Sequence, residues 1–176
     1  FGSFGVKKYV TGAHQNDVPA DTKVRVNVSY ELPNGTTEAD YPTWANKPTS
    51  NPYTVEVTVG QQQATDTLRE FPKGTKVTLT EDTSAAALPE ALGWGSKTFS
   101  VNGTETQDTA TFSVDSSVQA VGLYNDVIQK TGSFSISKKV EGSNKEAFSK
   151  ETFRIDYTCE NDSKGTLDVK GDGTPV

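Results

Sequence analysis

Three residues of this 176-residue chain could react with one another: Lys8, Glu81 and Asn125. Each occupies an alternating position among the apolar residues of its own extended segment. Because alternate residues of a strand face the same side, the pattern directs an amine, a carboxyl and a carboxamide into one core. Polar groups buried without partners are strongly unfavourable. The sequence therefore predicts that these three side chains meet.

An amine, an acid and a carboxamide held together away from water can form a covalent crosslink. Burial disfavours the ammonium form of a lysine, so a neutral Lys8 amine would be the nucleophile. A protonated Glu81 would donate a hydrogen bond to the Asn125 carbonyl and move protons, and ammonia would leave. This reaction happens once per molecule. We therefore expect self-modification with Glu81 as proton shuttle, and no enzyme.

The composition excludes several classes of protein. The net charge of −6 argues against nucleic acid and anionic membranes as partners. No apolar run approaches the length of a membrane span.

The single histidine, His14, has no cluster of further ligands, so we expect neither metal nor cofactor. One cysteine, Cys159, allows no disulfide within these residues. We expect it to pair with a residue outside them, with a buried free thiol as the alternative.

The elements that must position the three residues are short strands. The candidates are Phe4–Val10, Val24–Leu32, Tyr53–Val59, Thr65–Phe71, Lys76–Glu81, Lys97–Val101, Thr109–Val114 and Gln119–Val127. Asn34-Gly35 and Asn102-Gly103 are tight-turn signals. Such spacing is typical of an all-β, antiparallel sandwich. Ala85–Leu92 is the one stretch where we expect a short helix, and we expect Trp44 and Trp94 to pack in the core or anchor loops.

The chain contains an internal repeat. Gly2–Val10 matches Gly132–Val140 at an offset of 130, and Val24–Tyr30 matches Phe153–Cys159 at an offset of 129. This predicts a tandem array. We expect a complete sandwich over residues 1–127, a linker over 128–131 and the N-terminal part of a second repeat over 132–176. Within the repeat Lys8 recurs as Lys138, whereas Lys7 is replaced by Ser137, which favours Lys8 as the reactive amine.

The segments that carry the trio resemble the collagen-adhesin B-type (CnaB-like) domain, an immunoglobulin-like repeat of Gram-positive surface adhesins and pilins. They are Val6-Lys7-Lys8, then Leu68 to Glu81 with Pro72 and Gly74, then Leu123-Tyr124-Asn125. The resemblance implies an immunoglobulin-like sandwich with an intramolecular Lys–Asn isopeptide bond promoted by the acid. The Phe-x-x-x-Tyr-x-Cys strand from Phe153 to Cys159 is similar to related actinobacterial wall-protein repeats, in which a second cysteine follows.

The resemblance also implies a function and a location. It indicates a structural stalk domain of a secreted, cell-wall-attached surface adhesin, whose partners are the neighbouring repeats of the same chain. The alternative is a module that binds a host protein or glycan. In that case the long loop Pro33–Pro52 with Tyr41 and Trp44, and Tyr53 just after it, would stack on the ligand.

Overall fold

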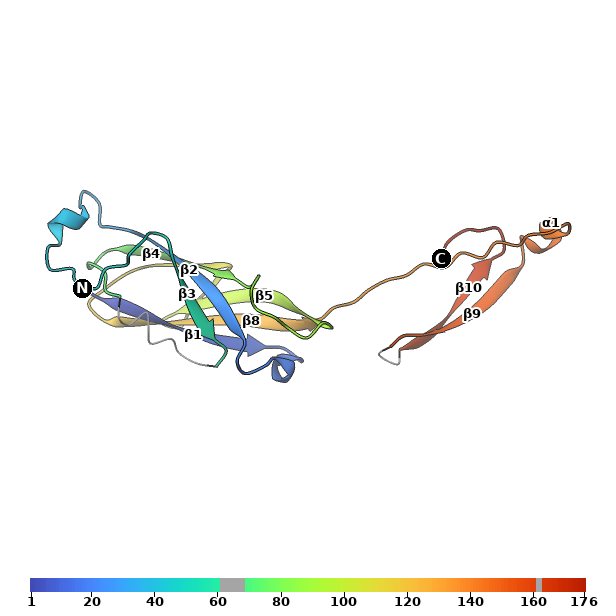
Figure 1. The fold of residues 1–176 in the computed structure, drawn as a ribbon, viewed down its shortest axis with the longest axis horizontal. Helices are drawn as coiled ribbons and strands as arrows, with labels where there is room; N and C mark the ends of the chain where they lie inside the picture. The colour runs from blue at the N-terminus through green and yellow to red at the C-terminus, as the bar shows by residue number, and fades with distance from the viewer. Residues whose placement is uncertain (61–68, 161–162) are drawn as a thin grey trace. The chain divides into compact units, whose positions relative to one another are not determined.

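The computed structural model describes residues 1–60, 69–160 and 163–176 and divides into two units, Phe1–Lys130 and Thr131–Val176 (Figure 1). The regular elements of the first unit are almost all strands. They are β1 (Ser3–Thr11), β2 (Lys23–Glu31), β3 (Tyr53–Thr58), β4 (Lys76–Asp82), β5 (Leu92–Val101), β6 (Thr104–Gln107), β7 (Thr109–Ser113) and β8 (Val118–Gln129). Two 3-10 turns, η1 (Gln15–Asp17) and η2 (Glu38–Asp40), lie in its loops.

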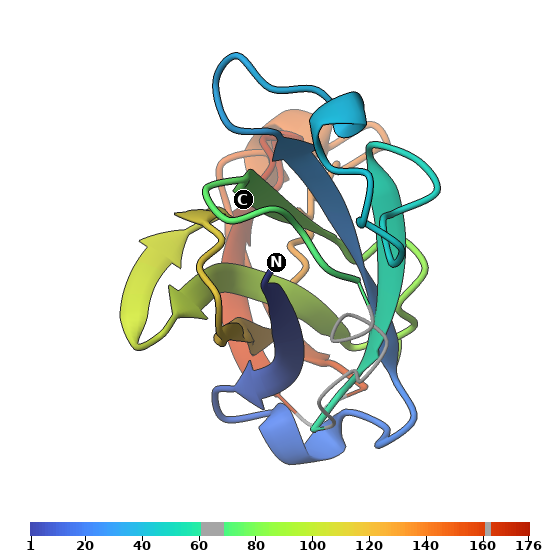
Figure 2. The ribbon, with the colours of Figure 1, turned by 90° about the vertical axis from the view of Figure 1, so that its left-hand side faces the viewer.

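The strands of the first unit form two four-stranded sheets. One has the order β1-β8-β5-β6 and the other β3-β2-β4-β7. β2 and β3 can be followed side by side in both views (Figures 1 and 2). The predicted immunoglobulin-like β-sandwich is therefore confirmed, with β1 and β8 adjacent as expected.

Alternation along the strands builds the core between the sheets. In β8 the buried residues are every second one from Gln119 to Val127. β-branched and aromatic residues supply most of the core, as suits a pleated, half-buried surface. The fully buried apolar side chains include Phe4, Val6, Val26, Val28, Val57, Phe71, Val77, Leu79, Phe99 and Leu123.

The β1–β8 pair differs from the expected arrangement because it is parallel, whereas the other pairs of both sheets are antiparallel. In its register Lys8 lies opposite Leu123 and Val10 lies opposite Asn125. The first and last strands of the unit therefore run in the same direction, and their chain ends leave at opposite ends of the pair.

Three expectations about elements need correction. No helix forms over Ala85–Leu92; the segment has turns and Leu92 begins β5. Pro89 explains this, because proline disfavours helical backbone in the residue before it and removes a hydrogen-bond donor. β5 begins five residues before the predicted Lys97, and the exposed strand β6 was not predicted.

The predicted strand Thr65–Phe71 falls largely outside the described residues, which resume at Arg69. Neither Arg69 nor Glu70 belongs to a strand. Phe71 forms an isolated bridge with Gly2, in which Gly2 N donates to Phe71 O at 2.9 Å and Phe71 N to Gly2 O at 2.8 Å.

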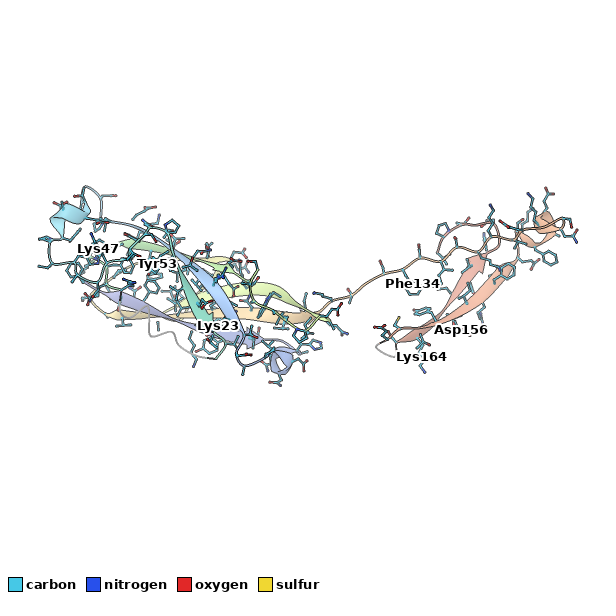
Figure 3. All side chains as sticks on the ribbon, viewed as in Figure 1. Lys23, Lys47, Tyr53, Phe134, Asp156 and Lys164 are labelled. Carbon is cyan, nitrogen blue, oxygen red and sulfur yellow. The ribbon has the colours of Figure 1, made fainter. Side chains whose placement is uncertain are left out.

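The second unit contains a one-turn helix and a two-stranded antiparallel sheet. These are α1 (Lys145–Phe148), β9 (Thr152–Thr158) and β10 (Lys164–Lys170). Alternate residues of both strands are partly buried on one face, and Val169 of β10 is fully buried. Phe134, labelled in Figure 3, packs edge-on against Tyr157 with ring centroids 5.0 Å apart.

Candidate functional site

The structure brings Lys8, Glu81 and Asn125 together between the two sheets. Lys8 and Asn125 come from the adjacent strands β1 and β8, and Glu81 comes from β4 in the opposite sheet. The side chains of Lys8 and Glu81 have no exposed area, and Asn125 is 1% exposed. Three strands far apart in sequence thus converge on a site closed to solvent.

The three side chains form a connected set of short contacts. Lys8 Nζ donates to Asn125 Oδ1 at 2.5 Å. Asn125 Nδ2 donates to Glu81 Oε2 at 2.7 Å, and Lys8 Nζ lies 3.2 Å from Glu81 Oε1. The acid therefore contacts both the amine and the amide nitrogen of the carboxamide.

The site makes the Lys8 amine easier to deprotonate. Its pKa is lowered from 10.5 to about 8, chiefly because burial removes water from the ammonium, while the nearby Glu81 charge opposes this shift. With such a pKa about one amine in ten is neutral at pH 7. Lys8 is thus a buried lysine whose neutral amine, the nucleophilic form, is populated at neutral pH.

Glu81 contacts a different atom of Asn125 from the one expected. We expected the acid at the Asn125 carbonyl oxygen, but that oxygen accepts from Lys8 and the acid accepts from Nδ2. The donor and acceptor inventory explains the arrangement. An ammonium can only donate, so it takes the carbonyl oxygen, and the amide N–H is left for the carboxylate.

Trp94 is a member of the site that the sequence argument did not assign to it. Lys8 Nζ lies 5.4 Å from the centroid of the Trp94 ring. Trp94 lies in β5 opposite Val127, next to a register irregularity that ends at Lys97. Its flanking glycines, Gly93 and Gly95, are the sequence signal that could have indicated an irregular strand here.

The other candidate residues do not join this site. His14 Nδ1 lies 3.1 Å from Asp17 Oδ2 in a loop. Cys159 is a partly buried free thiol, and its expected disulfide stays a prediction. Lys138, the repeat counterpart of Lys8, is exposed and lies 5.3 Å from the Phe153 ring centroid. No cluster of three or more metal-ligating side chains occurs in the described part of the chain.

The long loop that could bind a ligand turns its main aromatic residue inward. Trp44 is 5% exposed and belongs to the core cluster, as expected of a loop anchor. Its indole N–H donates to the Glu70 carbonyl. Phe1 stacks on Trp44 with centroids 6.4 Å apart, and Tyr41 meets it edge-on at 6.4 Å. Trp44 is therefore not free to stack on a ligand.

Comparison with protein families identifies the chain. A family described as "Domain of unknown function (DUF5979)" matches residues 4–127 and again residues 134–176. The chain belongs to this family. A comparison with curated proteins finds no match.

Among solved structures, the chain is similar to pilus proteins. For a pilus-presented adhesin, Spy0125 (Cpa), the identity is 15% and the TM-score 0.42, covering 71% of this chain and 27% of that chain. For the major pilin (T-13) of Streptococcus pyogenes the values are 18% and 0.36, covering 71% and 44%. Another major pilin from Streptococcus pyogenes gives 15% and 0.36, covering 71% and 47%.

These solved chains are longer than the part that aligns, since the match spans between about a quarter and a half of each. All three are pilus proteins. Among the residues described here, no helix is both long and apolar enough to cross a bilayer.

Proposed function

We propose that the first unit is a structural stalk domain of a secreted, cell-wall-attached surface adhesin, closed by an amide bond between Lys8 and Asn125. The observation that carries the proposal is the 2.5 Å contact of Lys8 Nζ with the Asn125 carboxamide, in a closed site where Glu81 reaches both partners. Hydrogen bonding alone would explain burial of the three groups. The lowered Lys8 pKa adds the reactivity that a crosslink requires.

The contacts define an order of proton transfers. Lys8 Nζ gives one proton to Glu81 Oε1 and becomes a neutral amine, whose lone pair attacks Cγ of Asn125. Glu81 then gives its proton to Nδ2 and takes the proton that Nζ must lose. The Cγ–Nδ2 bond breaks and ammonia leaves. The product is a secondary amide and a protonated Glu81, formed once and without turnover.

The position of the bond suits a domain under tension. Lys8 lies in the first strand and Asn125 in the last, 117 positions apart in sequence. Force applied to the ends of the first unit would pass from β1 through the bond into β8, and would bypass the chain between them. That stretch corresponds to about 400 Å of extended chain that tension cannot release.

Replacement of the acid tests the proposed reaction. Glu81→Gln keeps the shape of the side chain and one acceptor oxygen, but it cannot accept from both Asn125 Nδ2 and Lys8 Nζ, and it cannot take the Lys8 proton. We expect the purified variant to keep the full mass of its own sequence. A matched control is Glu56→Gln, because Glu56 is an exposed strand residue 3.8 Å from Lys23; this variant should lose one ammonia. Complete ammonia loss in Glu81→Gln would exclude the role of the acid.

A further inference from the structure

The Trp94 ring is placed by packing and not by hydrogen bonding. Its Nε1 is buried and has no hydrogen-bond partner among the described residues. A buried donor without a partner is unfavourable, so the indole N–H does not explain why a tryptophan occupies this position. The ring instead contacts Lys8, whose Nζ lies 5.4 Å from the ring centroid.

The backbone of β5 holds the ring over the amine. Trp94 pairs with Val127, and the next regular pair is Lys97 with Asn125, so Gly95 and Ser96 are accommodated irregularly. A side chain at Gly95 would approach Ile128 Cγ2 to 3.1 Å and the Asp126 carbonyl to 3.2 Å. The strand therefore lies close to β8 here, and beside this close approach the Trp94 ring centroid lies 5.4 Å from Lys8 Nζ.

We propose that Trp94 is a positioning residue for the crosslink, whose ring closes the site over Lys8 Nζ, keeps water from the amine and holds it against Asn125. This inference rests on the proposed function. It adds a residue from a third strand of the same sheet, one that does not itself react.

Two effects of the ring on the amine oppose each other. The negative face of an aromatic ring attracts an ammonium and would favour the charged form. Exclusion of water disfavours the charged form. Burial is the largest cause of the lowered Lys8 pKa, so in this site the loss of water outweighs the opposing effect of the Glu81 charge.

The other groups around the amine do not account for this shift. Glu81 of β4 is the charge that acts on Lys8, and it works in the opposite direction. Asn125 of β8 is uncharged, and Lys97 of β5, on the same face as Asn125 by register, is partly exposed. The lowered pKa of Lys8 therefore results from the exclusion of water by the ring and the core.

The most direct test measures the titration of Lys8 where no crosslink can form. In an Asn125→Ala background, NMR of selectively labelled lysine would follow Lys8 with Trp94, Trp94→Phe or Trp94→Leu. We expect Lys8 to titrate well below 10.5 in the chains that carry Trp94 or Trp94→Phe. In the Trp94→Leu chain we expect Lys8 to titrate nearer to 10.5. Equal Lys8 midpoints in all three chains would overturn the proposal. Because the leucine keeps the position apolar, loss of the fold does not decide the outcome.

The pH profile of crosslinking gives a second, independent readout. Chains with an intact Asn125 would be refolded from denaturant between pH 6 and 10, and the loss of ammonia timed by mass. Each unit by which the Lys8 pKa rises lowers the neutral fraction at pH 7 about tenfold. We therefore expect Trp94→Leu to crosslink at least about tenfold more slowly at pH 7 and to recover at high pH, with Trp94→Phe close to the wild type.

The two readouts separate the proposals. A wild-type chain that never loses ammonia would contradict the proposed function, and the Lys8 titration would still decide the role of Trp94. A wild-type chain that crosslinks alongside a leucine variant with an unchanged profile would contradict the role of Trp94 alone.

Discussion

At the scale of residues, the site is defined by which atom faces which. Lys8 can only donate, and the carboxamide of Asn125 offers one acceptor and one donor group. Glu81 completes the set by accepting from the amide nitrogen and lying within 3.2 Å of the amine. The same burial that keeps water from these contacts lowers the Lys8 pKa, as the proposed attack on Asn125 requires.

A pH-dependent stability distinguishes the uncrosslinked from the crosslinked chain. Without the bond, the pKa of Lys8 is about 8 in the folded chain, against its ordinary value of 10.5 in the unfolded chain. The unfolded chain then binds more protons between these values, so the free energy of unfolding increases as pH rises from about 8 to about 10.5. The gain is up to about 3 kcal/mol. In the crosslinked chain Lys8 is an amide and makes no such contribution.

Denaturant unfolding at several pH values would measure this effect in Asn125→Ala. The double variant Lys8→Met, Asn125→Ala is the control, because it keeps every other titrating group. A stability difference between the two variants that stays constant from pH 8 to 10 would contradict the account.

At the scale of elements, the start of β1 depends on a glycine. A side chain at Gly2 would come within 1.7 Å of the Asp115 carbonyl oxygen, which is backbone and cannot simply rotate away. Gly2 also exchanges two backbone hydrogen bonds with Phe71. Its repeat counterpart Gly132 has nothing within 4 Å.

We expect Gly2→Ala to destabilise the first unit by about 1–3 kcal/mol, because overpacking forces the backbone to shift. Gly132→Ala should change the stability of the first unit by no more than about 0.5 kcal/mol, as is usual for exposed positions. Thermal unfolding of both variants measures the difference. Equal melting temperatures would mean that β1 is not fixed at Gly2 in the way described.

The alternation of inward-facing and outward-facing residues could be predicted from the sequence, but the relative direction of the strands could not. Parity alone placed Lys8, Glu81 and Asn125 on inward faces, because the two-residue period of a strand is local information. The parallel direction of β1 and β8 depends on how distant strands are connected. Asn102-Gly103 indicated a turn, and both residues have the positive φ that such a turn requires. The strand β6 that follows could not be predicted, because all of its residues are exposed and no alternation of buried residues marks it.

The proposed role of Trp94 could not be predicted from local pattern for a similar reason. The position of Trp94 depends on how β5 pairs with β8, and that pairing is irregular between Trp94 and Lys97. The absence of a helix near Ala85 could have been predicted, since Pro89 lies within the segment.

At the scale of the whole molecule, the proposed bond would join the two ends of the first unit. Closing a loop of 117 positions resembles a long-loop disulfide, which stabilises by about 4–5 kcal/mol through the unfolded chain. We expect Asn125→Ala to melt well below the wild type, and calorimetry would measure the shift. Equal melting temperatures would contradict the stabilising role of the bond.

The mass of the intact chain decides whether the proposed bond between Lys8 and Asn125 forms. We expect the folded wild-type chain to be lighter than its sequence by one ammonia, and a digest to contain a peptide joined through Lys8 and Asn125. Lys7→Ala should show the same loss, and Lys8→Ala should not. A wild-type mass equal to that of the sequence, or a crosslink that maps to Lys7, would contradict the account.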